Sequence, residues 1–345
     1  MLASGLAILS LALAFLAPLL AVMLAMPPFL SFLRRKGWVV DDVHKQPPTK
    51  VPSPVGPVIF AAIVLGEAVV LLFFGSFVPL ALIGVATVAF LVGIWDDVSS
   101  LGGPTKPVLL LLVAVPLVAA FAVEPDIYVP RLVFPILGAT SEHFTIYTIL
   151  VVAAFPIVAN AFNMMDSFNG EMSGFTFLAT LALTFGIALH AYATSGYSLA
   201  RFAAALPLLS VSAGFYLFNR HPSRAFDGNS GSLLFGATFA ALAITSGVEV
   251  AAIVAIVPAI LNSFYILSSV RGLVERRRMS TRPTFMGEDG QLYATPGPSA
   301  PNTLARLVLL AGPLSEKGLV REILELTAVT CLLSAVTSVL TWVVV

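Results

Sequence analysis

Two adjacent aspartates, Asp96 and Asp97, end an apolar run, and Lys106 stands just before the next apolar run. If the first run is a helix, both carboxylates lie at its C-terminal end, where the helix dipole disfavours anions by about 0.3–1 kcal/mol. Their mutual repulsion at about 4 Å adds roughly 1 to 4 kcal/mol, depending on the local dielectric. We therefore expect a bound cation or a proton-transfer role at this pair, the alternative being a solvated acidic pair at a membrane interface.

A second group of polar residues recurs at intervals of three: Asn160, Asn163 and Asp166. This spacing places the three side chains near one face of a helix. Amide and carboxylate oxygens are ligands that suit Mg²⁺. Asparagine also caps the carbonyl groups of helix ends. The segment is therefore either a metal-binding face or a polar helix end.

The segment 218–232 joins a basic stretch to glycines and leads directly into an apolar run. Free N–H groups at the N-terminus of a helix, preceded by a glycine-bearing loop, form a phosphate site. The sequence therefore predicts a phosphate-binding loop here. His221 within the segment is more typical of a structural interfacial histidine than of a ligand.

Five arginines crowd a short stretch near the C-terminal third of the chain: Arg271, Arg276, Arg277, Arg278 and Arg282. Arginine at a membrane boundary often sets topology or faces lipid headgroups, but its planar fork also grips phosphate in a bidentate manner. Asp289-Gly290, between alternating apolar residues, predicts a small hairpin just beyond them. We expect residues 271–302 to form a cytoplasmic arginine-rich loop that holds the arginines over a substrate.

The composition requires that lipid-embedded elements position these residues. Of 345 residues, 58% are hydrophobic and 10% charged, with a mean hydropathy of +0.98, whereas soluble domains carry roughly 25% charged residues. At about 20 residues per crossing, we predict an all-α polytopic membrane protein, a single integral-membrane domain over residues 1–345 with ten transmembrane helices. The predicted helices are 2–32, 57–74, 79–95, 107–123, 144–162, 172–193, 202–218, 232–246, 250–267 and 323–345.

The charges predict the orientation of these ten helices. Of the 18 Lys and Arg residues, all but Arg131 and Arg201 fall in loops on one side of the predicted membrane. The positive-inside rule makes that side cytoplasmic, so both termini are expected outside. Every polar cluster lies on the cytoplasmic side, including the small loop and hairpin between helices 9 and 10. We therefore expect the active site of a multi-pass cell-membrane protein to face the cytoplasm.

Together, an acidic pair, an Asn/Asp face, a phosphate-type loop and an arginine loop suit metal-assisted phosphoryl transfer. A secondary transporter or a flippase of lipid-linked sugars is the second hypothesis. Such proteins place their site near the midplane on interrupted helices. Here the predicted spans contain almost no ionisable residues, and the exceptions, Glu67 and His190, are expected toward the outer ends of their spans.

At these motifs the sequence resembles the polyprenyl-phosphate N-acetylhexosamine-1-phosphate transferase family over most of the chain. The matching motifs are 41–45 with Val51-Pro52, Asp96-Asp97 with Lys106, 160–170 and 222–226; 301–303 and 312–316 are similar to the branch that uses dolichyl phosphate. The resemblance implies transfer of N-acetylglucosamine-1-phosphate from UDP-N-acetylglucosamine to a dolichyl or polyprenyl phosphate. It also implies release of UMP, dependence on Mg²⁺ or Mn²⁺, and the first membrane step of a lipid-linked glycan pathway.

The resemblance also implies roles for individual residues. Lys106 would contact the diphosphate, and Asp96 and Asp97 would serve the lipid phosphate or its deprotonation. Asn169 and Phe226 would hold the uracil. The remaining substrate-binding residues would be His44, Lys45, Arg276, Arg277, Arg278 and Arg282, and Asn163 would be a metal ligand. Asn229 stands at the position of a second metal ligand, and we take Asp166 and Asp227 as further candidate ligands. The expected partners are a UDP-sugar and a membrane lipid phosphate rather than a nucleic acid, and a homodimer is compatible with the architecture.

Two departures from the family pattern matter. The chain has Gly228-Asn229 where the family has Gly-Asp, so one negative charge is lost, which should weaken divalent-metal binding. Our hypothesis is that Asp227 or Asp166 restores this charge. The first loop, 51–57, also lacks the family's paired glycines. A catalytically impaired member is therefore an alternative, as is a two-step mechanism through Asp97 in place of direct in-line attack by the lipid phosphate.

Overall fold

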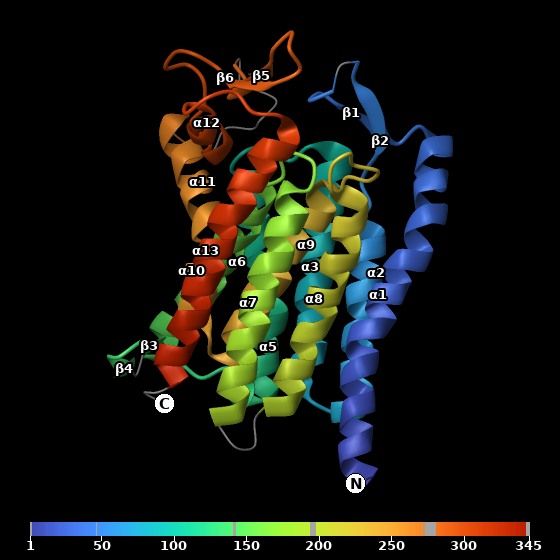
Figure 1. Ribbon diagram of the computed structural model, residues 1–345. Coiled ribbons are helices and arrows are strands. Elements are labelled where there is room, and N and C mark those ends of the chain that lie inside the picture. The colour runs from blue at the N-terminus through green and yellow to red at the C-terminus, as the bar shows by residue number, and fades with distance from the viewer. Residues whose placement is uncertain are drawn as a thin grey trace.

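The computed structural model describes residues 2–45, 47–140, 143–193, 198–270, 272 and 281–342. Long helices lie side by side in a bundle with short hairpins at its two ends (Figure 1). The helices are α1 (Leu2–Lys36), α2 (Gly56–Phe74), α3 (Phe77–Ser99), α4 (Thr105–Leu110), α5 (Val115–Val123), α6 (Phe144–Met164), α7 (Glu171–Ala193), α8 (Ser198–Asn219), α9 (Gly228–Ser246), α10 (Glu249–Ala255), α11 (Val257–Ser269), α12 (Leu304–Leu309) and α13 (Glu316–Trp342). Short 3₁₀ segments η1 (Leu111–Ala114) and η2 (Pro125–Ile127) and six strands complete the described chain: β1 (Val39–Asp42), β2 (Thr49–Pro52), β3 (Val133–Phe134), β4 (Gly138–Ala139), β5 (Thr284–Met286) and β6 (Leu292–Ala294).

The described helices confirm a polytopic membrane protein. Eight helical units are long and apolar enough to cross a membrane: α1, α2, α3, the continuous α4–η1–α5 unit, α6, α7, α8 and α13. The pair α10 and α11 adds a ninth if the two form one broken span. All ten predicted runs lie on helical segments of the structure. The run 107–123 lies on α4, η1 and α5, the run 250–267 on α10 and α11, and the run 232–246 on α9. The count of ten crossings stays a prediction.

The helix α9 forms the centre of the bundle. Every residue from Ser230 to Ser246 is buried, as expected for a helix that is apolar all round and surrounded by protein. Its backbone lies directly against α3, since a Cβ added to Gly93 would lie 2.5 Å from the Ser230 Cα and 2.7 Å from the Asn229 carbonyl oxygen. Small residues at such crossings let membrane helices approach closely. The approach brings the end of α3 to the beginning of α9.

The broken pair α10–α11 bends by 65°. Pro258, in the first turn of α11, lacks an N–H group and interrupts the helical hydrogen bonds. Asn262 fixes the bent segment, because its Nδ2 donates to the Met164 carbonyl at 2.9 Å and its Oδ1 accepts the Leu304 N–H at 2.8 Å. Through these two hydrogen bonds, Asn262 connects α11 to the end of α6 and to the start of α12.

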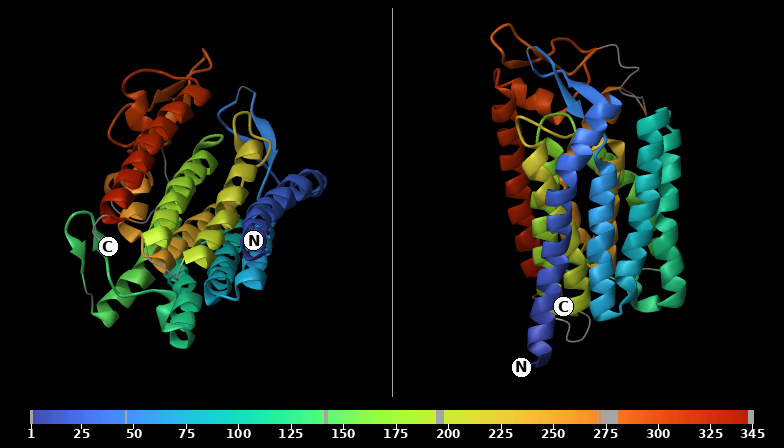
Figure 2. Two further views of the ribbon diagram at one scale, coloured as in Figure 1. Left: turned by 60° about the horizontal axis from the view of Figure 1, so that its bottom comes forward. Right: turned by 90° about the vertical axis from the view of Figure 1, so that its right-hand side faces the viewer.

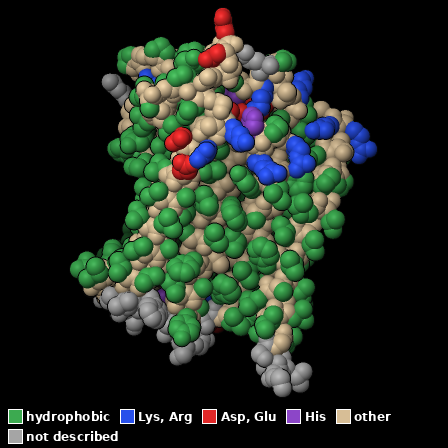
Figure 3. Space-filling view, viewed as in Figure 1, with side chains coloured by type: hydrophobic (Ala, Val, Ile, Leu, Met, Phe, Trp, Pro, Cys, Tyr) green, Lys and Arg blue, Asp and Glu red, His purple; other side chains and the backbone are tan. Residues whose placement is uncertain are grey.

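The two ends of the bundle differ in character. The beginning of α1 and the end of α13 lie at one end of the bundle (Figures 1 and 2). The β1–β2 and β5–β6 hairpins lie at the other end, which we call the hairpin end. Lys and Arg side chains gather near the hairpin end, above flanks that are mostly hydrophobic (Figure 3). The antiparallel β5–β6 pair confirms the hairpin predicted around Asp289-Gly290, whereas the β1–β2 hairpin was not predicted.

Candidate active site

Lys106 lies at the centre of the candidate site. Its Nζ is 3.0 Å from Asp96 Oδ2, and it donates hydrogen bonds to Asn163 Oδ1 at 2.8 Å and to Asn229 Oδ1 at 3.0 Å. These partners come from α3, α6 and α9, while Lys106 is in the first turn of α4. Three motifs that are far apart in the sequence therefore meet at one ammonium group. We call the oxygens of Asp96, Asn163 and Asn229 the oxygen cage.

Of the regularly spaced polar residues on α6, Asn163 points into the cage. Its Nδ2 donates to Asn229 Oδ1 and to Ser232 Oγ, each at 2.8 Å, which turns its Oδ1 toward Lys106. Asn160, one turn earlier, instead donates to the Pro156 carbonyl of its own helix at 2.7 Å. Asn160 therefore fits the interpretation as a polar helix end, whereas Asn163 joins the cage and its role as a metal ligand stays a prediction.

Asp97 lies at the N-terminus of α9. Its carboxylate accepts the backbone N–H of Asn229 at 2.7 Å and that of Ser230 at 3.0 Å, where the helix dipole stabilises an anion. Gly228, with a φ of +71°, makes this contact possible, since a Cβ there would lie 2.8 Å from Asp97 Oδ2. The predicted phosphate site at this helix N-terminus is therefore occupied, at these two N–H groups, by a carboxylate of the protein.

Asp227, just before α9, is fully buried, and its two carboxylate oxygens have no hydrogen-bond partner among the described residues. Burial raises the pKa of Asp227 well above its usual range, and the negative charges of Asp166 and Asp97 raise it further. Its Oδ2 lies toward Gly231 on α9, where Ile59 of α2 also packs. Asp166 is half-buried beyond the end of α6.

The donor atoms around Lys106 are of the type that a hard divalent cation takes. Mg²⁺ prefers carboxylate, carbonyl and water oxygens, and the cage offers one carboxylate and two amide oxygens. Buried Asp227, whose carboxyl oxygens have no partner in the described chain, lies close by, but its raised pKa favours the neutral form. Of the four residues predicted as ligands, Asn163 and Asn229 belong to the cage, and Lys106 itself lies among the cage oxygens.

The loop before α9 is fastened to the end of the β1–β2 hairpin. The Phe226 N–H donates to the Pro52 carbonyl at 3.0 Å, the Val55 N–H to the Phe226 carbonyl at 3.0 Å, and the Gly56 N–H to the Asp227 carbonyl at 3.1 Å. These backbone bonds hold the loop that carries the half-buried Phe226 against the segment that follows β2. The segment 51–57 therefore still supports the loop, although it lacks paired glycines.

A second polar cluster forms around Glu316, the first residue of α13. Lys45 donates to Glu316 Oε2 and lies 3.5 Å from Asp42 Oδ2. Asn169 joins the same two carboxylates, since its backbone N–H donates to Glu316 Oε1 and its Nδ2 to Asp42 Oδ2, each at 2.9 Å. His221 Nδ1 lies 3.2 Å from Glu316 Oε2. We call these five residues the Glu316 cluster.

The predicted substrate-binding residues Lys45 and Asn169 thus belong to the Glu316 cluster, whereas Phe226 belongs to the loop before α9. His44 stacks on Phe168 at 4.5 Å between ring centroids, next to Asn169. Carboxylates of Asp42 and Glu316 and a His44 nitrogen lie within 4.8 Å of one another. Sequence reasoning missed Glu316 as a site residue; the available signal was an acidic residue three positions after Pro313, ahead of the predicted helix 323–345.

Of the arginine-rich loop, the structure describes residues 272 and 281–302. Arg276, Arg277 and Arg278 lie outside the described residues. Arg282 is exposed just before β5. Arg306, which was not predicted as a site residue, fixes the segment 295–300 that follows β6. It donates to the carbonyls of Thr295 at 3.1 Å, Gly297 at 2.8 Å and Ala300 at 3.1 Å.

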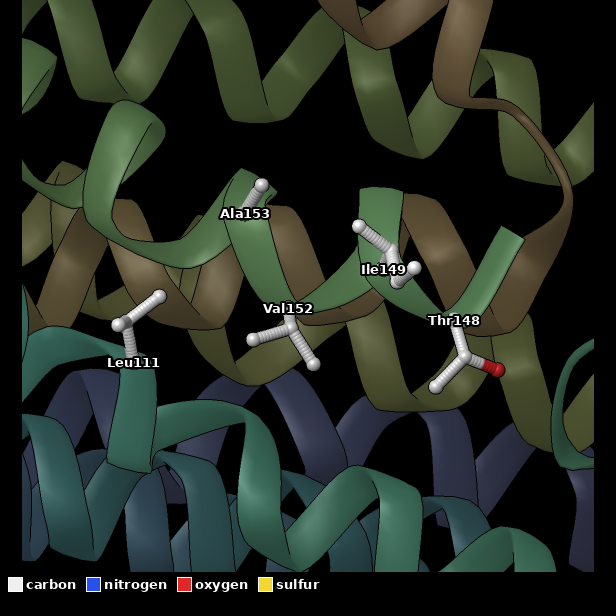
Figure 4. Close-up of a pocket in the computed structure, with 5 residues that line it drawn as sticks. All are labelled: Leu111, Thr148, Ile149, Val152 and Ala153. Carbon is white, nitrogen blue, oxygen red and sulfur yellow. The ribbon is translucent and has the colours of Figure 1, made fainter. Parts of the chain in front are cut away.

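An apolar groove of about 270 Å³ opens on the flank of the bundle between η1 and α6. It is lined by Leu111, Thr148, Ile149, Val152 and Ala153, of which Leu111 faces α6 across the groove (Figure 4). The same two helical units carry Lys106 and Asn163 nearer the hairpin end. The groove and the oxygen cage therefore share their supporting helices.

The sequence model of glycosyl transferase family 4 matches residues 79–247. This region holds Asp97, Lys106 and the three residues that meet at Lys106. The chain belongs to this family. The predicted membership is thereby confirmed, and the family region contains the oxygen cage, whereas Asp42, Lys45 and Glu316 lie outside it.

Several characterised or named proteins are similar to this family 4 member. A putative glycosyltransferase of Methanocaldococcus jannaschii is 27% identical over 81% of each chain. A putative UDP-N-acetylglucosamine–dolichyl-phosphate N-acetylglucosaminephosphotransferase of Sulfolobus acidocaldarius is 26% identical over 83% of this chain and 84% of its own. An enzyme with the same activity in its name, from Dictyostelium discoideum, is 25% identical over 66% of this chain and 60% of its own.

Proposed function

We propose that this glycosyltransferase transfers N-acetylglucosamine-1-phosphate from UDP-N-acetylglucosamine to a dolichyl or other polyprenyl phosphate and releases UMP. The names of the Sulfolobus and Dictyostelium relatives support the donor and the acceptor. Similarity to a phospho-N-acetylmuramoyl-pentapeptide-transferase, 27% identical over 67% of this chain, supports the wider reaction class. The product, a lipid-linked sugar diphosphate, makes this the first membrane step of a lipid-linked glycan pathway.

The observation that carries this proposal is the convergence of Asp96, Asn163 and Asn229 on Lys106. The lipid phosphate and the UDP-sugar bring about four negative charges together, counting two for a phosphomonoester past its second ionisation. Phosphoryl transfer depends mainly on positioning and charge neutralisation. An ammonium held by three helices at the membrane boundary supplies both for the diphosphate.

In the proposed step, an oxygen of the lipid phosphate attacks the sugar-bearing phosphorus of the donor. A new P–O bond forms as the bond between this phosphorus and the UMP oxygen breaks, so UMP leaves with the bonding pair. Both carboxylate oxygens of Asp97 accept backbone N–H groups, which makes this carboxylate a poor nucleophile. We therefore favour direct in-line attack over a two-step route through Asp97.

We propose that Mg²⁺ or Mn²⁺ assists, held by Asn163 and Asn229. Asp166 would supply negative charge nearby, as would Asp227 once the charge of the ion lowers its raised pKa. Such an ion, when bound, neutralises charge that develops on the phosphate oxygens. The suitable oxygen donors and the unpartnered buried carboxylate of Asp227 support this proposal. In place of the aspartate usual in the family, Asn229 contributes an oxygen without its charge.

The groove between η1 and α6 is the proposed seat of the polyprenyl chain. Its lining is apolar and faces the flank of the bundle, where a lipid enters without crossing the protein. Asn163 follows Ala153 by ten residues on α6, a rise of about 15 Å. A lipid phosphate at the head of the groove would therefore lie near the oxygen cage.

We propose that the hairpin end, with the active site, faces the cytoplasm and that both termini lie outside. Basic residues in the last turn of α1 (Arg34, Arg35 and Lys36) lie at this end. The positive-inside rule places such clusters on the cytoplasmic side. UDP-sugars would then reach the site from the cytoplasm.

The test is UMP release by the purified protein. We expect release from UDP-N-acetylglucosamine that requires both polyprenyl phosphate and Mg²⁺, and lower rates with a panel of other UDP-sugars. Omission of the lipid phosphate provides the control for simple hydrolysis. A transporter, or a catalytically impaired family member, would release no UMP under any of these conditions, which would contradict the proposal.

A further inference from the structure

The ammonium of Lys106 uses all of its hydrogen-bonding capacity within the oxygen cage. A lysine ammonium has three N–H donors, and Lys106 has three oxygen partners at 2.8–3.0 Å. Its side chain is only 14% exposed. The oxygens that suit a divalent cation are therefore already arranged around a cation that belongs to the protein.

The amide oxygens of the cage are held in place independently of Lys106. Asn163 Nδ2 donates hydrogen bonds to Asn229 Oδ1 and Ser232 Oγ. Ser232 Oγ in turn donates to the Gly228 carbonyl at 3.0 Å. The backbone of Asn229 is fixed by Asp97. The two amide oxygens should keep their positions when the ammonium moves away.

The charge balance of the cage disfavours a divalent ion while Lys106 is present. Asp96 is the carboxylate of the cage, and Lys106 neutralises it at 3.0 Å. The carboxylate of Asp97 is directed to the N–H groups of α9, and that of Asp227 lies toward Gly231. The negative charges of Asp97 and Asp166 also favour the charged form of Lys106. Among the described residues, an approaching ion would therefore meet a like charge in the cage, and that charge already neutralises the cage's own carboxylate.

We infer that Lys106 and a divalent cation compete for the oxygen cage, so that the ion enters as the ammonium leaves. The inference deepens the proposed function and rests on it, because the phosphate oxygens of the nucleotide are what would draw Lys106 out. Metal and nucleotide then bind with positive coupling, and linkage makes that coupling reciprocal. The uncharged Asn229 makes the competition sharper, since its amide oxygen attracts the ion less strongly than a carboxylate would.

The test is a titration of the substrate-free protein in detergent with Mn²⁺, with free Mn²⁺ measured by electron paramagnetic resonance. We expect weak binding by the wild type and at least tenfold tighter binding by Lys106→Met and Lys106→Gln. Lys106→Gln is one atom shorter but keeps an N–H donor and removes the charge, so it serves if the methionine variant unfolds. Lys50→Met, which removes an exposed lysine of β2, should bind Mn²⁺ like the wild type.

A second readout tests the coupling. Saturating UDP should tighten Mn²⁺ binding to the wild type several-fold more than to Lys106→Gln, because the variant has no ammonium to displace; the affinity of Mn²⁺ for UDP itself is common to both. Mn²⁺ affinities that are equal in the wild type and both Lys106 variants would overturn the competition. Because neither readout requires turnover, absence of UMP release would refute the proposed function without affecting this result.

Discussion

The Asp97 carboxylate binds the N-terminus of α9 through the backbone N–H of Asn229, at 2.7 Å. This contact joins residues 132 positions apart in the sequence and sets the C-terminal end of α3 against the N-terminal end of α9. An anion that the dipole of its own helix disfavours is thereby stabilised by the dipole of another helix. The same contact fixes the backbone of Asn229, whose side chain belongs to the oxygen cage.

Asp97→Asn should lower both stability and activity. An amide accepts one of the two N–H groups but presents its own NH₂ to the other, which leaves a buried donor unpaired at a cost of about 1–3 kcal/mol. We expect a lower melting temperature in detergent and a loss of sugar-phosphate transfer of about a hundredfold. Asp41→Asn, at an exposed position of β1, is the matched control and should change neither quantity.

The engaged oxygens of Asp97 also predict that no covalent sugar-phosphate enzyme forms. Intact-protein mass spectrometry after incubation with UDP-N-acetylglucosamine, without lipid phosphate, should show the mass of the unmodified chain. An added N-acetylglucosamine-1-phosphate mass that disappears in Asp97→Asn would instead establish the two-step route.

Gly93→Ala should separate α3 from α9. The new Cβ would lie 2.5 Å from the Ser230 Cα and 2.7 Å from the Asn229 carbonyl oxygen, and these backbone atoms cannot move without disturbing the Asp97 contact. We expect at least a tenfold loss of transfer and faster proteolysis at the hairpin end. Gly102→Ala is the control, because its Cβ would meet only Thr105 Oγ1 at 3.8 Å; similar losses in both variants would contradict this packing argument.

Glu316→Gln should destabilise the Glu316 cluster. Glu316 is 5% exposed, and removal of its charge leaves Asp42 as the one carboxylate that Lys45 and Asn169 share. Loss of a hydrogen bond to a charged group costs about 1.5–3 kcal/mol, which a melting curve would resolve. Glu325→Gln, on the same helix, breaks the exposed pair with Arg321 and should have little effect; an equal shift in the two variants would show that the cluster adds no stability.

The sequence predicted the individual helices and hairpins better than the contacts between them. The acidic pair at a helix end, the hairpin around Asp289-Gly290 and the apolar runs follow from local patterns. That Asp97 faces the start of α9, and that Asn163 but not Asn160 enters the cage, depends on helix crossings that no local pattern specifies. The bend before Pro258 had a signal in that proline, but the run 250–267 was predicted as one span.

The Glu316 cluster was the harder part to predict. It assembles from four separate segments, with Asp42 and Lys45 after α1, Asn169 before α7, His221 after α8 and Glu316 at the start of α13. His44 and Lys45 were predicted to bind substrate, but nothing in the residues around Glu316 indicated that α13 begins beside them. Long-range pairing of this kind has no short-range signature.

The most direct measurement compares transfer by Asn163→Ala and Asn160→Ala, two identical substitutions one turn apart on α6. Asn163 contacts Lys106 and Asn229, whereas Asn160 bonds only the Pro156 carbonyl among the described contacts. If the oxygen cage is the catalytic centre, UMP release that depends on lipid phosphate should fall at least a hundredfold in Asn163→Ala and by no more than a few-fold in Asn160→Ala. Equal rates in the two variants would contradict the assignment of the cage as the active site.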